Sequence, residues 1–436
     1  MKKTLESINK LYSGYEIFPV KSETACLLKW SWSTIQMGTG SSSSCHRTRF
    51  YKIDPDNFGN FHNLPEKIKD REMMLAGKWP GNGCEYCKNV EDNNGISDRV
   101  MTLMRNHVAD KVPPELFENP EETSVTPTIL EIYFNNTCNL SCVYCGPYHS
   151  SQWNQEINKF GPIKIDTLSI DKFTSNHDNY DKLVSGLWTY LAENDRYKVI
   201  RQFQILGGEP LIQKELDQCI SFWKTHPNPS LTINIISNLM LPHDRFVEKI
   251  SQFENMVNSH TIYTLALTAS LDCLGPEQEY ARYGIDLAVW LKNFEYLLDK
   301  PWIHLSIHSC INVLSIKTLS DLMAKIVEWN THRPPNMPID HSFDFVIGGE
   351  YSGLHPTTFG PGVFDDDFKK IIDLMPVDTD TQQSSKKQMQ GLAKYVKNTA
   401  RNSEQIAVLI KYLEELDRRR ATNWREIFPW ISEIVD

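Results

Sequence analysis

The chain has 436 residues, of which 40% are hydrophobic and 23% charged, and its formal net charge is −10. This is the composition of an ordinary globular protein, long enough for two or three domains. No stretch approaches eighteen consecutive apolar residues, so we expect no membrane span, and the acidic balance weighs against a nucleic-acid partner. The N-terminus lacks the apolar core of a secretory signal, so we expect a cytoplasmic protein.

The first quarter of the chain is rich in Gly, Ser and Asn, with little sustained periodicity. Four of the ten cysteines lie there: Cys26, Cys45, Cys84 and Cys87. A reducing cytoplasm favours metal binding or chemistry over disulfides for clustered cysteines. Because such a segment builds little core from its own side chains, we expect a loop-rich domain over residues 1–115 that is held by a metal.

From Thr128 onward, short β-rich runs alternate with amphipathic helical stretches, which predicts a parallel α/β fold. The predicted strands are 129–134, 200–206, 231–236, 263–271, 303–310 and 343–347, a count that suits a partial barrel. The predicted helices are 180–193, 213–224, 245–256, 287–298 and 316–329.

The tail beyond about Phe364 is predicted to be helical, with Ile406, Leu409, Leu413 and Leu416 on one face. The run Arg418-Arg419-Arg420 ends that helix. We interpret it as a solvated helix C-terminus, where cations are favoured by the helix dipole.

Cys138, Cys142 and Cys145 form a C-x3-C-x2-C triplet directly after the first predicted strand of this α/β region. Three thiolates would leave one iron of a 4Fe-4S cluster open, whereas ferredoxins supply four per cluster. A structural zinc site is the alternative. Zinc requires a fourth ligand, for which His149 is the nearest candidate.

A second motif, Leu206-Gly207-Gly208-Glu209-Pro210, ends the next predicted strand. Paired glycines let the backbone approach a ligand closely, and Glu209 offers a carboxylate to an ammonium group. An ordinary strand-to-helix turn would have a similar sequence.

The segment from Phe134 through Cys145, with Asn139 and Tyr144, resembles the motif of the radical S-adenosylmethionine (SAM) superfamily, and the Gly-Gly-Glu-Pro sequence matches a second motif of that family. The resemblance implies a partial (β/α)6 TIM-like barrel over residues 125–350, followed by a helical region at 364–436. It also implies that the open iron chelates SAM, that Tyr144 lies near the adenine, and that Gly207, Gly208 and Glu209 hold the SAM amino group.

Two further matches to this family follow later strands. Ser237 and Asn238 fall where the family presents polar groups to the ribose, and Asp272 belongs to a similar Ser-x-Asp. Arg282 is a candidate for the SAM carboxylate or the substrate. Polar strand ends that satisfy their own turns are the alternative. All these positions lie at the carboxyl ends of strands, where parallel barrels assemble their sites.

The N-terminal cysteines, with Trp79-Pro80 before Cys84 and with Glu91, Gly95, Ser97 and Arg99 after Cys87, resemble the twitch or SPASM auxiliary-cluster domain. This implies a second 4Fe-4S cluster held by four cysteines. Four thiolates also suit zinc, so the metal stays open. The domain precedes the barrel here, whereas it follows the barrel in the best-known relatives.

Cys273 and Cys310 end predicted strands and are candidates for returning a hydrogen atom to a substrate radical; a buried hydrophobic role is the alternative. The resemblance implies a peptide substrate, modified by crosslinking, epimerisation or oxidation, and a reductant such as flavodoxin or ferredoxin. The same chemistry on a small molecule, such as a sugar or amino acid derivative, and a non-catalytic zinc-binding protein are the alternatives.

Overall fold

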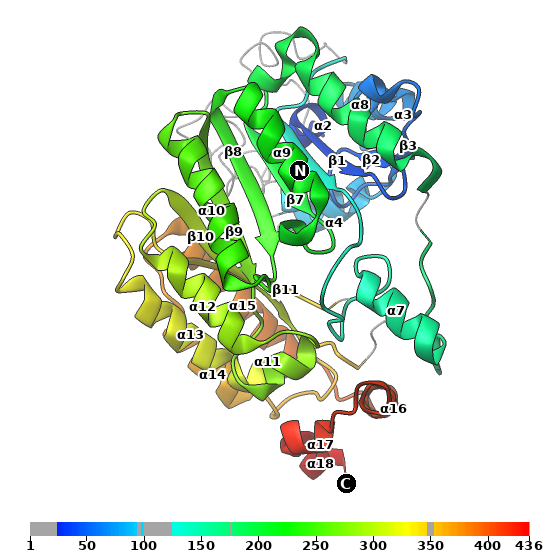
Figure 1. Cartoon of the computed structure of the whole chain (residues 1–436). Helices are drawn as coiled ribbons and strands as arrows, with labels where there is room; N and C mark the ends of the chain where they lie inside the picture. The colour runs from blue at the N-terminus through cyan, green and yellow to red at the C-terminus, as the bar shows by residue number, and fades with distance from the viewer. Residues whose placement is uncertain (1–23, 94–96, 100–123, 175–176, 347–352, 436) are drawn as a thin grey trace.

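The computed structural model describes residues 24–93, 97–99, 124–174, 177–346 and 353–435, and its main feature is one large sheet (Figure 1). The strand order is β11-β10-β9-β8-β7-β4-β1-β2-β3. Every pair from β11 to β1 is parallel, and β2 and β3 are antiparallel additions. The strands are β1 (Trp32–Gln36), β2 (Ser41–Ser43), β3 (Tyr51–Lys52), β4 (Ile129–Tyr133), β7 (Gln202–Leu206), β8 (Asn228–Ser237), β9 (Ile262–Ser270), β10 (Ile303–Ile311) and β11 (Asp340–Phe345).

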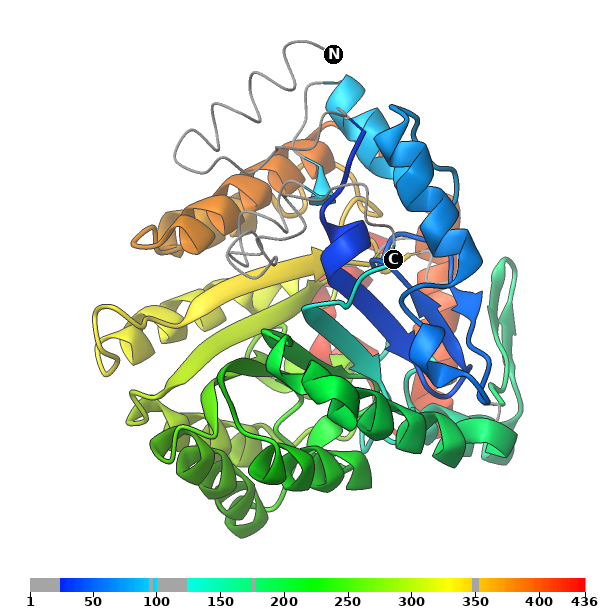
Figure 2. The ribbon, with the colours of Figure 1, turned by 90° about the horizontal axis from the view of Figure 1, so that it is seen from above.

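The strands from β4 to β11 include all six that the sequence predicts. The last differs most, because β11 begins at Asp340, three residues before the predicted start. Its polar residues alternate with buried ones, and pairing with β10 holds them in the sheet. Viewed from above, the strands lie along an arc with helices on its outer side (Figure 2).

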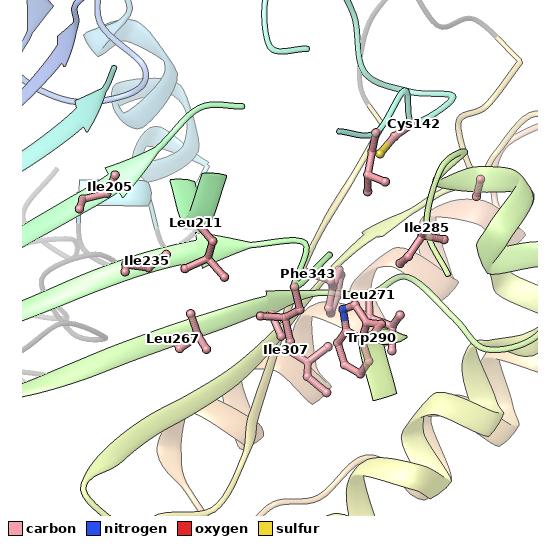
Figure 3. Packing of buried hydrophobic residues seen from close by; sticks show 14 of the residues in the cluster. Cys142, Ile205, Leu211, Ile235, Leu267, Leu271, Ile285, Trp290, Ile307 and Phe343 are labelled. Carbon is pink, nitrogen blue, oxygen red and sulfur yellow. The ribbon is translucent and has the colours of Figure 1, made fainter. Parts of the chain in front are cut away.

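The five predicted connecting helices are confirmed: α8 (Tyr180–Ala192), α9 (Lys214–Thr225), α10 (His243–Asn258), α12 (Leu287–Leu298) and α13 (Ile316–Asn330). Each buries an apolar stripe against the sheet or a neighbouring helix. The sheet presents apolar side chains from neighbouring strands, among them Ile205, Ile235 and Leu267, to this packing (Figure 3). The sequence analysis did not predict α7 (Ser151–Phe160), α11 (Pro276–Ala281) or the hairpin of β5 (Ile163–Ile165) and β6 (Leu168–Ile170).

The N-terminal segment contains more regular structure than its composition predicts. Besides β1 to β3 it contains α2 (Leu28–Ser31), α3 (Pro65–Leu75) and α4 (Cys84–Asp92). Strand β1 pairs with β4 in parallel, from Trp32 with Ile129 to Gln36 with Tyr133. Ile35 and Phe61 join the main core. The segment therefore shares the sheet and core of the α/β region, which short-range periodicity does not reveal.

The C-terminal tail is helical, as predicted, with α14 (Asp365–Leu374), α15 (Asp380–Lys397), α16 (Ser403–Arg420), α17 (Trp424–Ile427) and α18 (Pro429–Val435). Helix α15 contacts β11, and α16 lies near β5. The four predicted apolar residues of α16 are buried. Among the described residues, no helix combines the length and apolar character that crossing a membrane requires.

Candidate functional site

The loop that carries Cys138, Cys142 and Cys145 follows β4 and is tied to distant parts of the chain. The backbone N–H of Ser141 donates to the Tyr283 carbonyl (2.9 Å), and that of Val143 donates to the Ala281 carbonyl (2.8 Å). The indole of Trp153 donates to the Cys142 carbonyl (3.0 Å). The backbone around the thiols is therefore positioned by two other segments, Ala281–Tyr283 and the helix that contains Trp153.

Helix α16 braces the same loop. The Tyr412 hydroxyl donates to the Val143 carbonyl (2.7 Å). The Arg420 guanidinium lies between the rings of Trp153 (4.9 Å) and Tyr283 (4.7 Å). Arg419 and Arg420 are only 7% and 8% exposed and lie beside Glu156. The prediction of a solvated arginine run is therefore wrong for these two residues, because α7 supplies a carboxylate and aromatic rings that the tail sequence does not show.

The Gly-Gly turn after β7 packs directly against the cysteine loop. Gly208 has a φ of +57°, and a Cβ atom there would lie 2.2 Å from the Thr137 carbonyl oxygen. The Glu209 N–H donates to that same oxygen (2.8 Å). Only glycine combines this backbone conformation with so close an approach. The two predicted motifs are thus in direct contact.

Glu209 is 1% exposed, and its carboxylate accepts three hydrogen bonds. The donors are the Leu211 N–H (3.0 Å), the Ser237 hydroxyl (2.7 Å) and the Asn238 N–H (2.6 Å). Burial raises the pKa of Glu209 to about 7 against the opposing effect of these donors. Since a carboxylate offers about four acceptor positions, one is left for a ligand.

Asn238 connects the end of β8 to the cysteine loop. Its side-chain amide donates to Asn139 Oδ1 (2.8 Å) and lies 3.9 Å from Cys138 Sγ. All three thiols, the Gly-Gly-Glu turn and β8 border one cavity of about 210 Å³. Predicted site residues that line it are Cys138, Cys142, Tyr144, Cys145, Gly207, Gly208, Glu209, Ser237, Asn238 and Arg282.

Asp272 lies behind this cavity as a buried anchor. Arg282 donates to it through Nη2 (2.8 Å) and Nε (3.1 Å), and the Tyr144 hydroxyl also donates to it. Asp272 is fully buried and is not among the residues that line the cavity, so it orients Tyr144 and Arg282 rather than contacting a ligand there. The Arg282 guanidinium lies 5.6 Å from the centre of the Tyr144 ring.

The two candidate hydrogen donors differ in their surroundings. Cys273 is fully buried, with its thiol 3.7 Å from the Gln278 side-chain oxygen. Cys310 is partly exposed, and its N–H donates to Asp272 Oδ1 (2.8 Å). Neither lines the cavity that the triplet borders. Cys310 is therefore the more exposed of the two, and its backbone is held by Asp272.

The four N-terminal cysteines, Cys26, Cys45, Cys84 and Cys87, line one separate pocket together with Lys29, Trp79 and Arg99. Burial raises the pKa of Cys26 to about 12 and that of Cys84 to about 11. Their thiols are therefore neutral at pH 7 unless a metal or cluster binds and displaces the protons.

Two buried ion pairs frame this pocket. Lys29 binds Asp70 (2.5 Å), and Arg99 binds Glu91 through both carboxylate oxygens. Arg99 also donates to the Ala25 carbonyl (2.6 Å) and lies 4.7 Å from the Trp79 ring centre. In the described part of the chain, no group of three or more His, Cys, Asp or Glu side chains is arranged to hold a metal ion.

Sequence reasoning missed several residues that build the site. Tyr412 and Arg420 lie far away in the chain and carry no motif. Tyr133, Leu206 and Ile236 line the cavity from neighbouring strands. Strand alternation offers a signal for these three, because every second residue of a strand shares a face.

No family model matches the chain, and no curated protein matches it. Among solved structures, one described as native anSMEcpe with bound AdoMet and Kp18Cys peptide is 14% identical, with a TM-score of 0.31, over 56% of this chain and 57% of that one. One described as TYW1 with a lysine-pyruvate adduct bound is 17% identical, with a TM-score of 0.27, over 54% of this chain and 68% of that one. The matched region thus spans little more than half of the first of these proteins.

Proposed function

We propose that this chain is a radical SAM enzyme whose initiating cluster is held by Cys138, Cys142 and Cys145. The observation that carries the proposal is that these three thiols and Glu209 border one cavity at the carboxyl edge of a parallel sheet. Active sites of parallel α/β folds are built at this edge. When bound there, a 4Fe-4S cluster supplies the electron that splits SAM into methionine and a 5'-deoxyadenosyl radical, which takes a hydrogen atom from the substrate.

The kinds of donor present suit such a cluster, although the described side chains are not arranged around a metal ion. Three thiols supply three iron ligands, and the Leu140 N–H donates to Cys138 Sγ (3.4 Å), which stabilises a thiolate. The Arg282 side chain, which is paired with Asp272, lines the cavity that the thiols border. Backbone bonds from Ser141 and Val143 hold the loop in place without using any thiol.

The cavity also supplies groups for SAM itself. Glu209 has one acceptor position left, which suits the methionine ammonium, and Gly207 and Gly208 line the same cavity. Ser237 and Asn238 border the same space and offer polar contacts to a ribose. Tyr144 presents its ring to the cavity while its hydroxyl is held by Asp272.

The proposal extends to a second 4Fe-4S cluster at Cys26, Cys45, Cys84 and Cys87, supported by the pocket that these four side chains share. The substrate is proposed to be a peptide, with a small molecule as the alternative, on the basis of the sequence resemblance. Cys310 is the proposed hydrogen donor because it is partly exposed and bound to the Asp272 network.

Anaerobic reconstitution of the full chain tests the proposal. We expect about eight irons per chain, four for each cluster, and formation of 5'-deoxyadenosine from SAM on reduction. Cys138→Ala should lose about half of the iron and all SAM cleavage. The matched control is Cys219→Ala in α9, because Cys219 is fully buried in a helix and should leave both unchanged apart from stability. Zinc binding without iron would overturn the proposal.

A further inference from the structure

One face of the sheet has polar residues beside the strand positions that line the proposed SAM cavity. Tyr133, Leu206 and Ile236 line that cavity from three neighbouring strands. Because side chains alternate along a strand, residues two positions earlier share the same face. These are Glu131, Gln204 and Asn234.

The strand register brings these residues into one row. Glu131 is paired with Gln204, and Gln204 with Asn234, while Thr34 of β1 is the partner of Glu131 on the other side. We call Thr34, Glu131, Gln204 and Asn234 the polar row. The flanking positions Leu130, Phe203 and Ile233 face the opposite way and are fully buried. These strands therefore have the polar row on one face of the sheet and buried apolar side chains on the other.

The polar row has one buried hydrogen-bond acceptor without a partner. Glu131 is 7% exposed, and its Oε1 accepts from the Thr34 hydroxyl (2.9 Å). Among the described residues, no ion pair reaches Glu131, and the buried Oδ1 of Asn234 has no hydrogen-bond partner. A buried acceptor without a donor is unfavourable, so a ligand that brings donors to this row would be stabilised.

The row contains one carboxylate, Glu131, and a second carboxylate lies further along the same face. Burial raises the pKa of Glu131, and a bound cation would lower it again by stabilising the carboxylate. Asp344, further along the same face, has an 85% exposed side chain, and His308 lies between Ser342 (3.0 Å) and Asp344 (3.6 Å). His46 and Arg47 of the nearby Cys45 loop both bind Asp98, and His46 also interacts electrostatically with Glu131.

We infer that the polar row is the subsite for a protonated amine or guanidinium of the substrate. Glu131 would pair with the cation, and Asn234 would accept one of its N–H groups, since charged donors form the strongest hydrogen bonds with carboxylates. The inference rests on the proposed function in taking this ligand to be the substrate. The cation belongs either to a Lys or Arg side chain of a peptide or to the amino group of a small molecule.

Binding to the reconstituted full chain, measured by ligand-observed NMR and calorimetry without reductant, tests the inference. One arm compares acetylated, amidated Gly-Lys-Gly and Gly-Arg-Gly with Gly-norleucine-Gly; the other compares butylamine and butylguanidinium with butanol. In at least one arm, the cationic probe should bind about tenfold more tightly than its neutral counterpart. Preference in the first arm alone assigns a peptide, and in the second alone a small molecule.

Variants show whether the polar row produces the preference for cationic probes. Glu131→Gln should bring the affinities for cationic and neutral probes to within about twofold of each other. Asn234→Asp, which adds a carboxylate to the row, should increase the preference for the cationic probe. Glu248→Gln, on the exposed side of α10, is the matched control and should leave it unchanged. Equal binding of cationic and neutral probes, or a preference that survives Glu131→Gln, would overturn the inference. If the chain prefers cationic probes but cleaves no SAM, the proposed function is wrong and the cation subsite is still supported.

Discussion

The two cysteine sites are built in contrasting ways. The triplet loop of Cys138 to Cys145 is held by hydrogen bonds to β-strand ends, to the segment at Ala281–Tyr283 and to α16, which are far away in the chain. The four-cysteine pocket is lined by residues that all belong to the first hundred of the chain, and two buried ion pairs frame it.

This difference separates two ways of fixing a cofactor. A loop tied to many elements keeps its geometry when one contact is lost, because the remaining contacts share the restraint. A pocket framed by a few buried charges depends on each of them, since an unpaired buried charge is strongly destabilising. We therefore expect the two sites to respond differently to substitution.

The largest expected effect distinguishes the roles of the two sites. Cys84→Ala should remove about half of the iron but leave reductive SAM cleavage in place, because the initiating cavity contains only the triplet thiols. Cys138→Ala should remove a similar share of iron and abolish cleavage. Iron analysis and quantification of 5'-deoxyadenosine check this. If cleavage is lost equally in both variants, the two sites are not separable in this way.

A smaller effect concerns the ion pairs of the N-terminal pocket. Arg99→Met leaves the buried Glu91 without its cation and should lower the free energy of unfolding by about 3–5 kcal/mol. Lys88→Met, which breaks an exposed pair on α4, should change it by less than about 0.5 kcal/mol. Denaturant unfolding of the full chain measures both. Equal losses would contradict the dependence of this pocket on buried charge.

The smallest effect concerns protonation at the triplet cavity. Burial raises the pKa of Glu209 to about 7, so its carboxylate forms as the pH rises through 7. The affinity for the SAM ammonium should then increase about tenfold between pH 6 and pH 8, following the ionised fraction. His149 also lines the cavity, but burial lowers its pKa, which moves its titration to more acidic pH than that of Glu209. Calorimetric titration with SAM checks this.

Glu209→Gln is the control for this prediction, because it keeps the shape of the side chain without the charge. Its affinity should be weak and independent of pH. A wild-type pH profile that persists in Glu209→Gln would assign the titration to another group.

Local patterns predicted much of the fold. Alternating β-rich and amphipathic runs located six parallel strands and five connecting helices, because each element buries an apolar face of its own period. They did not predict that β1 joins the sheet beside β4, since that pairing links segments nearly a hundred residues apart. Nor did the terminal arginine run reveal its burial, because Glu156 and Trp153 lie in a helix from another part of the chain.

The sequence by itself determined which residues carry the proposed chemistry, because thiol spacing, paired glycines and a following carboxylate are local features of the chain. Only the tertiary structure decided which of them meet. It brought Gly208 and Glu209 against Thr137, placed Asp272 behind the cavity instead of in it, and buried Cys273 away from the triplet. It also aligned Thr34, Glu131, Gln204 and Asn234, because strand register, which depends on long-range pairing, sets which side chains share a row.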